Sequence, residues 1–150
     1  MNLKVTKMSE KYAREIVAWQ YPKPYELYNL EVADVKELLN EDYNAIIDKT
    51  TQLVGFYCTG KTAQVPAGHQ TNCYSNEFLD FGLGMKPELT GIGNGSTFLN
   101  FILFAIDEKS LRLTVTTFNL RAIKLYEKFG FIKRAQFSNG KTEFVVMCRD

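Results

Sequence analysis

The sequence predicts an α/β fold with a mixed sheet and helices on both of its faces. Strand-like runs, in which apolar and polar residues alternate, recur along the whole chain. Helical runs lie between some of them, whereas short turns join others. Since short turns give antiparallel pairs and helical crossovers give parallel pairs, both kinds of pairing are expected in one sheet.

Length and composition narrow the class of protein. The chain has 150 residues, of which 45% are hydrophobic and 23% charged, which is enough for one domain over residues 1–150 with its own core. Its 18 Lys and Arg residues nearly balance 17 Asp and Glu residues. Proteins that bind nucleic acid usually carry a larger basic excess, so no nucleic-acid partner is expected.

The number and spacing of the cysteines indicate whether the protein is expected in a reducing or an oxidising compartment. Cys58, Cys73 and Cys148 are far apart and odd in number, and His69 is the single histidine. This pattern predicts neither a disulfide framework nor a metal site, and it favours a reducing cytoplasm. The most apolar run, residues 98–106, is much shorter than the roughly 20 residues of a membrane helix, so no membrane partner is expected.

The N-terminal third predicts one strand and two helices. Residues 3–7 alternate as a strand, and Ser9 is placed to cap a helix over residues 10–19. Two prolines predict an irregular path over residues 21–25. A second helix is predicted over residues 32–39.

The middle of the chain predicts a hairpin, a loop and a further strand. Residues 43–48 and 52–58 are close enough to pair as a hairpin, and the polar residues 60–76 read as a loop. A strand is predicted over residues 78–85. It contains two glycines that indicate a bulge or the close approach of another group, namely Gly82 and Gly84.

The C-terminal half begins with a helix over residues 96–109. It is apolar almost all round, so it is expected to be deeply buried. A strand over residues 111–118 follows, and then a helix over residues 119–129 that ends at Gly130. The last two strands are expected to form a hairpin around an Asn-Gly turn, over residues 131–137 and 142–148.

Three glycines stand between the strand at 78–85 and the long apolar helix: Gly91, Gly93 and Gly95. Free backbone N–H groups at the start of a helix bind anions well, so this segment is a candidate phosphate site. A simple turn with one left-handed residue is the alternative. The spacing matches neither the dinucleotide fingerprint G-x-G-x-x-G nor the P-loop.

Two segments, residues 79–99 and 111–133, resemble the GNAT family of N-acetyltransferases. The family's cofactor signature is Gln/Arg-x-x-Gly-x-Gly/Ala, which the segment from Thr90 to Gly95 matches except that Thr90 replaces Gln or Arg. The block from Asn119 to Phe131 is a closer and more specific match. The order of predicted elements is also that of the family, whose sheet is mixed and mostly antiparallel.

The resemblance implies acetyl-CoA as cosubstrate and assigns its contacts. Leu83, Gly84 and Met85 would pair through their backbone with the pantetheine arm, and one of their N–H groups would polarise the thioester carbonyl. The pyrophosphate would be held by the glycine segment, which comprises Thr90, Gly91, Ile92, Gly93, Asn94, Gly95 and Ser96. No metal is implied.

The resemblance makes Tyr126 the general acid that protonates the departing thiolate, and it gives Asn119 a contact with the cofactor arm. A core position is the alternative for Tyr126, and a helix cap at Asn119 is compatible with its contact with the cofactor arm. Family members that acetylate ribosomal-protein N-termini use a glutamate as base where this chain has Thr114. Glu77 and Asp80 are the nearest substitutes, each with a solvated strand end as its alternative.

The expected activity is transfer of the acetyl group to a primary amine by direct attack, with a small amine as acceptor. A peptide N-terminus as acceptor and a non-catalytic acetyl-CoA-binding module are the alternatives. The aromatic residues between Trp19 and Tyr28 lie where the family's first helices line the acceptor cleft. A homodimer is a further expectation from the family.

Overall fold

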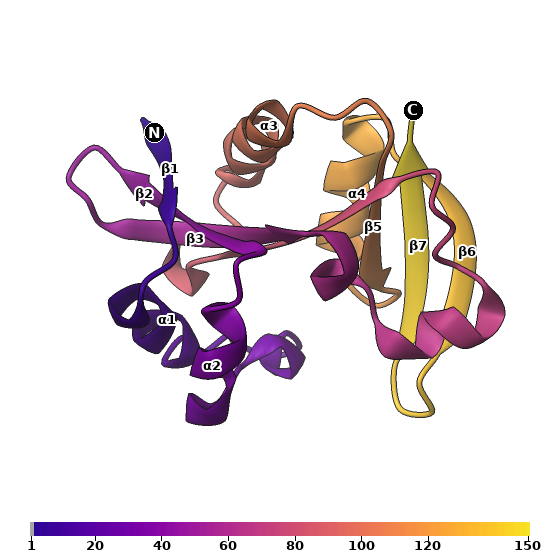
Figure 1. Cartoon of the computed structure of the whole chain (residues 1–150), viewed down its shortest axis with the longest axis horizontal. Helices are drawn as coiled ribbons and strands as arrows, with labels where there is room; N and C mark the ends of the chain where they lie inside the picture. The colour runs from indigo at the N-terminus through magenta and orange to yellow at the C-terminus, as the bar shows by residue number, and fades with distance from the viewer. Residues whose placement is uncertain (1) are drawn as a thin grey trace. The chain divides into compact units, whose positions relative to one another are not determined.

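The computed structural model describes residues 2–150. Seven strands form one sheet in the order β1-β2-β3-β4-β5-β7-β6. The strands are β1 (Leu3–Lys7), β2 (Tyr43–Asp48), β3 (Leu53–Thr59), β4 (Leu79–Met85), β5 (Leu111–Thr116), β6 (Ile132–Ser138) and β7 (Glu143–Arg149). The helices, labelled in Figure 1, are α1 (Glu10–Val17), α2 (Val35–Leu38), α3 (Gly95–Ile106) and α4 (Leu120–Lys128).

The predicted mixed sheet is confirmed. β4 and β5 pair in parallel, whereas β1–β2, β2–β3, β5–β7 and β6–β7 pair in antiparallel fashion. The chain divides into two compact units. The first unit runs up to Cys58 and includes Leu83–Ile106, and the second comprises Thr59–Gly82 and Asp107–Asp150. A single domain therefore stays a prediction.

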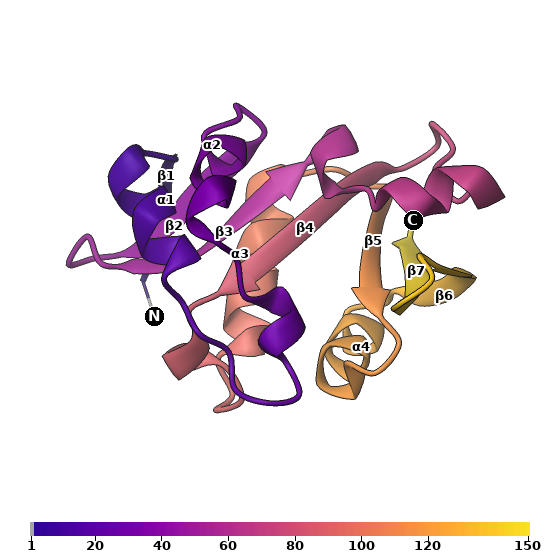
Figure 2. The same ribbon diagram turned by 90° about the horizontal axis from the view of Figure 1, so that it is seen from below.

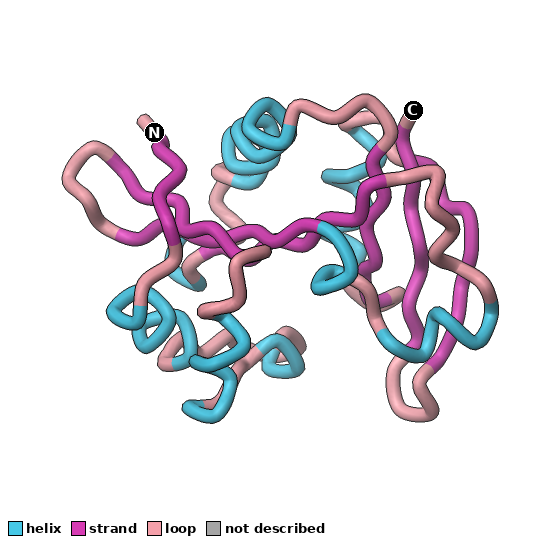
Figure 3. The backbone as a smooth tube through the Cα atoms, viewed as in Figure 1, coloured by secondary structure: helices cyan, strands magenta, loops and turns pink. Residues whose placement is uncertain are grey.

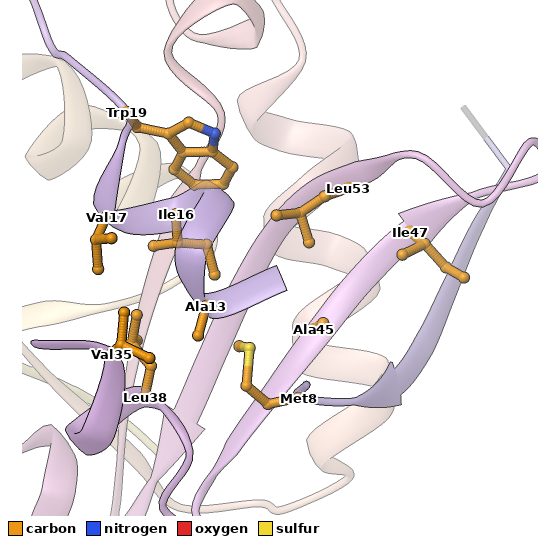
Figure 4. Packing of buried hydrophobic residues seen from close by; sticks show 10 residues of the cluster. All are labelled: Met8, Ala13, Ile16, Val17, Trp19, Val35, Leu38, Ala45, Ile47 and Leu53. Carbon is orange, nitrogen blue, oxygen red and sulfur yellow. The ribbon is translucent and has the colours of Figure 1, made fainter. Parts of the chain in front are cut away.

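The first unit packs its helices on two sides of β2 and β3, with α1 and α2 on one side and α3 on the other (Figure 1). Successive strand residues point to opposite faces. Accordingly, Phe56 faces Trp19, with ring centroids 6.2 Å apart, while a Cβ on Gly55 would collide with the ring of Phe98 in α3. The core on the α1 side, drawn in Figure 4, comprises Met8, Ala13, Ile16, Val17, Trp19, Val35, Leu38, Ala45, Ile47 and Leu53.

The second unit has its own core. α4 lies beside β5 (Figure 2). Phe137 and Val146 of the β6–β7 hairpin pack against side chains from the segment between β3 and β4, among them Tyr74 and Phe78. This segment was predicted to be a plain loop. It contains two short 3-10 helices, Gly60–Ala63 and Pro66–Thr71, which appear as helical turns in Figure 3.

The residues predicted to cap the start of one helix and to follow the end of another are confirmed in those roles. The hydroxyl of Ser9 accepts a 3.2 Å hydrogen bond from the backbone N–H of Tyr12, so Ser9 caps α1. Gly130 follows α4 with a φ of +93°, which a residue with a side chain adopts at a cost. The predicted helix at 32–39 is instead a 3-10 turn, Val32–Asp34, followed by the short α2.

The prediction that α3 is buried all round is wrong. Phe98, Leu99, Ile102 and Leu103 are buried, but Phe104 is 85% exposed. A helix has only one face against its sheet, so an apolar residue on the opposite face stays in solvent. α3 also ends at Ile106, before Asp107, which has a left-handed φ of +52°. None of the helices in residues 2–150 has the length and apolar composition that a membrane-spanning helix needs.

Candidate functional site

The glycine segment connects β4 to α3 in the first unit. Gly91 and Gly93 have φ angles of +73° and +89°, a region that glycine enters without the clash that a Cβ would cause. A Cβ on Gly93 would meet no atom within 4 Å. Its conformation rather than crowding therefore requires glycine, and the space beside it is open. Ile92, between the two glycines, is 68% exposed.

Two polar side chains fix the shape of this segment. The hydroxyl of Thr90 donates a 2.7 Å hydrogen bond to the carbonyl of Pro87, and the amide of Asn94 donates one of 3.1 Å to the carbonyl of Leu89. The carbonyl of Asn94 accepts the N–H of Phe98 at 3.0 Å, which starts the helix. Thr90 therefore has an internal role in the loop at the position where the family usually has Gln or Arg.

The start of α3 suits an anion. The first amides of any α-helix lack acceptors inside the helix, and the helix dipole places partial positive charge there. Here α3 begins at Gly95, shortly after the exposed Gly91 and Gly93. Left-handed glycines next to a helix start form concave groups of N–H donors. The residues present therefore fit a diphosphate.

Gly84 in β4 has a packing reason for being glycine. A Cβ at this position would overlap the ring of Phe56, which lies directly against the Gly84 backbone. The sequence suggested that a ligand strand approaches here. The structure shows that a neighbouring aromatic ring already requires the glycine, so Gly84 is not by itself a sign of a ligand.

The backbone N–H and C=O groups of residues 83–85 nevertheless point in directions that can be assigned. The N–H of Lys86 donates to the carbonyl of Val54 in β3 at 2.8 Å. Since backbone groups alternate along a strand, those of Leu83 and Met85 point away from β3. On that side the carbonyl of Met85 accepts a 2.7 Å hydrogen bond from the hydroxyl of Tyr21. Sequence reasoning missed this pair, whose members are 64 positions apart.

Asn119 and Tyr126 belong to α4 in the second unit. The Oδ1 atom of Asn119 accepts the N–H of Ala122 at 3.2 Å, so Asn119 caps α4 as its position predicted. Tyr126 is 8% exposed, and its carbonyl accepts the N–H of Phe131 at 3.1 Å. The N–H of Gly130 donates to the carbonyl of Glu127 at 3.0 Å, which completes a Schellman motif. This motif fixes the turn of helix that carries Tyr126.

Asp80 does not lie at a solvated strand end, so that alternative is wrong. It is 3% exposed and forms a two-point ion pair with Arg112, at 2.6 Å to Nε and 2.7 Å to Nη2. The side chain of Gln64 donates a further 2.8 Å hydrogen bond to Asp80. Both carboxylate oxygens are thus engaged, an arrangement that favours a structural role over that of a base.

Glu77 is exposed in the turn before β4. It lines an open cavity of about 420 Å³ in the second unit, together with Ser75 and Arg112. Thr114, at the position of the family's glutamate, has its hydroxyl 2.7 Å from that of Tyr74. Of the two carboxylates singled out by the sequence, Glu77 is therefore the accessible one.

The candidate residues divide between the two units. The glycine segment and residues 83–85 belong to the first unit, together with Tyr21, whereas the four side chains proposed for catalysis or the cofactor arm belong to the second. These four are Glu77, Asp80, Asn119 and Tyr126.

Solved structures with a similar fold are acetyltransferases. A spermidine N-acetyltransferase from Vibrio cholerae, solved in complex with CoA and spermine, is 20% identical, with a TM-score of 0.64 over 98% of this chain and 94% of that one. A GNAT-family acetyltransferase from Bacillus anthracis is 14% identical, with a TM-score of 0.68 over 99% of this chain and 94% of that one. At these identities the similarity shows the fold alone.

A search of curated proteins found no match. The family model described as acetyltransferase (GNAT) family, in contrast, matches residues 10–131. That match includes the glycine segment as well as the helix that carries Tyr126. The chain belongs to the GNAT acetyltransferase family.

Proposed function

We propose that the protein is an acetyl-CoA-dependent N-acetyltransferase whose acceptor is a small primary amine. The observation that carries this proposal is the glycine segment at the start of α3. Gly91 and Gly93 hold left-handed conformations there, are exposed, and lie next to the first turn of α3, where the helix dipole favours an anion. In a chain of this family, such a segment is suited to the pyrophosphate of acetyl-CoA.

The cosubstrate would be bound through backbone groups. Residues 90–96 would hold the pyrophosphate, and Leu83, Gly84 and Met85 would line the pantetheine arm. The backbone groups of Leu83 and Met85 point away from β3, which supports this pairing. An N–H of this strand would stabilise negative charge on the thioester oxygen as the amine attacks.

Two side chains are assigned the proton chemistry. The lone pair of the amine forms the new C–N bond, the C–S bond breaks, and the sulfur leaves with the electron pair. We assign to Tyr126 the proton that the sulfur receives, and to Glu77 the uptake of the proton that the amine nitrogen loses, through water. Asn119 would contact the cofactor arm while it caps α4. The products are the acetamide and CoA thiol.

A small polyamine-like amine is the preferred acceptor class. The spermidine N-acetyltransferase from Vibrio cholerae has a similar fold and was solved with CoA and spermine. Thr114 occupies the position of the base used by family members that acetylate ribosomal-protein N-termini, and its hydroxyl pairs with that of Tyr74. These two observations favour a small amine over a peptide N-terminus.

The test is thiol release from acetyl-CoA with a panel of polyamines, aminoglycosides and peptides. The proposal expects release that depends on at least one amine, together with the matching acetamide by mass spectrometry. Release with peptides alone would identify an N-terminal acetyltransferase. Binding of acetyl-CoA without release with any acceptor would identify a binding module, and either result would contradict the proposal.

A further inference from the structure

The chain contains two Asn-Gly pairs, Asn94–Gly95 and Asn139–Gly140. Such a pair is chemically labile, because glycine has no side chain to keep its backbone nitrogen away from the amide carbon of the preceding asparagine. Attack of that nitrogen on Cγ closes a cyclic imide and releases ammonia, and water then opens the imide to aspartate or isoaspartate. The structure places the two pairs in different environments for this reaction.

Asn139 and Gly140 lie in the turn that joins β6 to β7 in the second unit. Residues 138–141 are all exposed. Gly140 has a φ of +95°, and a Cβ built on it would meet no atom within 4 Å. Water therefore reaches this pair, and there is open space around Gly140 in which a ring can form.

The side-chain carbonyl of Asn139 is polarised for attack. Its Oδ1 atom accepts the N–H of Lys141 at 3.0 Å and the N–H of Thr142 at 2.8 Å. Attack on Cγ moves the carbonyl electrons onto Oδ1, and two backbone N–H groups directed at that oxygen stabilise the charge, as in an oxyanion hole. Within residues 2–150 the Nδ2 atom of Asn139 has no hydrogen-bond partner, so no described residue holds the leaving group.

The attacking nitrogen has a group beside it that takes its proton. The N–H of Gly140 donates a 3.0 Å hydrogen bond to the hydroxyl of Ser138. An amide nitrogen becomes a nucleophile only as it loses this proton. Because Ser138 is exposed, its hydroxyl can accept the proton while it gives its own to water.

Asn94 is held differently, at the start of α3 in the first unit. Its Nδ2 atom donates to the carbonyl of Leu89 at 3.1 Å, and its backbone carbonyl accepts the N–H of Phe98 at 3.0 Å. α3 begins at the next residue, Gly95. Ring closure would turn the backbone carbonyl of Asn94 away from the helix, so it would break both of these hydrogen bonds.

We propose that Asn139–Gly140 is a self-modification site, whereas the fold protects Asn94–Gly95. At Asn139 a bond forms from the Gly140 nitrogen to Cγ, and the proton of that nitrogen passes through Ser138 to water. The bond from Cγ to Nδ2 breaks, Nδ2 takes up a proton from water and leaves as ammonia, and a water molecule opens the imide. Nothing is oxidised or reduced. The product carries one more negative charge, which cancels the formal net charge of +1.

The test measures both pairs in the full chain by peptide mass spectrometry, after incubation in mildly alkaline buffer made with heavy-oxygen water, which labels each new carboxylate. Each rate is measured in the folded protein and in urea, where both pairs belong to a flexible chain. Folded Asn139 should react at least as fast as in urea. Folded Asn94 should react at least about tenfold more slowly than in urea, since its two hydrogen bonds must break first.

Two variants test the proton relay, Ser138→Ala and the matched Ser138→Thr, which keeps a hydroxyl. In the folded protein Ser138→Ala should slow the reaction of Asn139 at least about threefold, and Ser138→Thr should retain the wild-type rate. In urea the two variants should react alike. Equal rates of the two variants in the folded protein would contradict the relay.

The comparison of the wild type with and without urea needs no variant, so it decides the inference even where a substitution disturbs the turn. If folding slowed Asn139 as much as Asn94, the hydrogen bonds of the turn would lock the pair instead of activating it, and the inference would be overturned. Equal rates for Asn94 and Asn139 in the folded protein would overturn it as well.

Discussion

Arg112 of β5 and Asp80 of β4 form a buried ion pair, with Nε 2.6 Å from Oδ1 and both side chains almost fully enclosed. The two residues are register partners in the parallel β4–β5 pair. Arg112 also donates to the carbonyl of Ser75 at 2.8 Å, which ties the segment before β4 to the sheet. The hydrogen bonds to Asp80 raise the pKa of Arg112, so the guanidinium is always charged.

Asp80→Asn should therefore lower the free energy of unfolding by about 3–5 kcal/mol, because it leaves a buried guanidinium without its counter-charge. Urea unfolding measures this. Replacing both partners with apolar residues, Asp80→Leu with Arg112→Met, should cost less than the single change.

The matched control is Glu10→Gln in the exposed pair of Glu10 and Arg14, whose atoms are 3.6 Å apart. It should cost less than about 0.5 kcal/mol. A small effect of Asp80→Asn, comparable with the control, would show that the buried pair is unimportant for stability.

Thr51 in the β2–β3 turn has a φ of +66°, a region that a β-branched residue enters at a cost. Thr51→Gly should raise the free energy of unfolding by about 1 kcal/mol, since it removes that strain. Thr50→Gly is the control and should destabilise, because the Thr50 hydroxyl bonds to Asp48 at 2.6 Å. A loss of stability in Thr51→Gly would contradict the prediction.

Stability should fall in alkaline solution. Burial raises the pKa of Tyr21, Tyr43 and Tyr57 above the ordinary tyrosine value. Above about pH 10 the tyrosines of the unfolded chain lose protons while these stay protonated, so the unfolded state binds fewer protons. The contribution of these tyrosines to the free energy of unfolding should therefore be constant below about pH 9 and decrease as the pH rises through 10 and beyond. Tyrosinate absorbance and urea unfolding check this, and a flat profile to about pH 11 would contradict it.

Tyr126→Phe should lower kcat by about 100-fold, because the leaving thiolate loses its proton donor. The ring would remain against Phe131, at 6.2 Å between centroids, so the melting temperature and the Kd of acetyl-CoA should be retained. Tyr12→Phe serves as the control for loss of a phenol hydroxyl elsewhere. Unchanged turnover in Tyr126→Phe would show that Tyr126 is not the general acid.

Local sequence signals predicted the elements whose causes are local. Ser9 caps α1 and Gly130 ends α4, each through contacts within a few residues. The exposed face of α3 could not be predicted, because composition does not tell which side of an apolar helix meets the sheet. Phe104, predicted to be buried, lies on that exposed face.

The contacts that define the candidate site are mostly distant in sequence. Asp80 and Arg112 are 32 positions apart, and Tyr21 and Met85 are 64 apart. No turn or periodicity signal connects such positions, so a strand-end carboxylate could not be distinguished from a buried ion pair. The glycine segment was recognisable because its conformation depends on Gly91 and Gly93 themselves.

Titration calorimetry with acetyl-CoA and with S-acetylpantetheine, which lacks the pyrophosphate and the 3′-phosphoadenosine attached to it, tests the central claim most directly. If the amides around Gly91 and Gly93 hold the pyrophosphate, acetyl-CoA should bind at one site at least about 100-fold more tightly than S-acetylpantetheine, since several charge-assisted hydrogen bonds are lost. Equal affinities for the two compounds, or no heat with acetyl-CoA, would contradict the account.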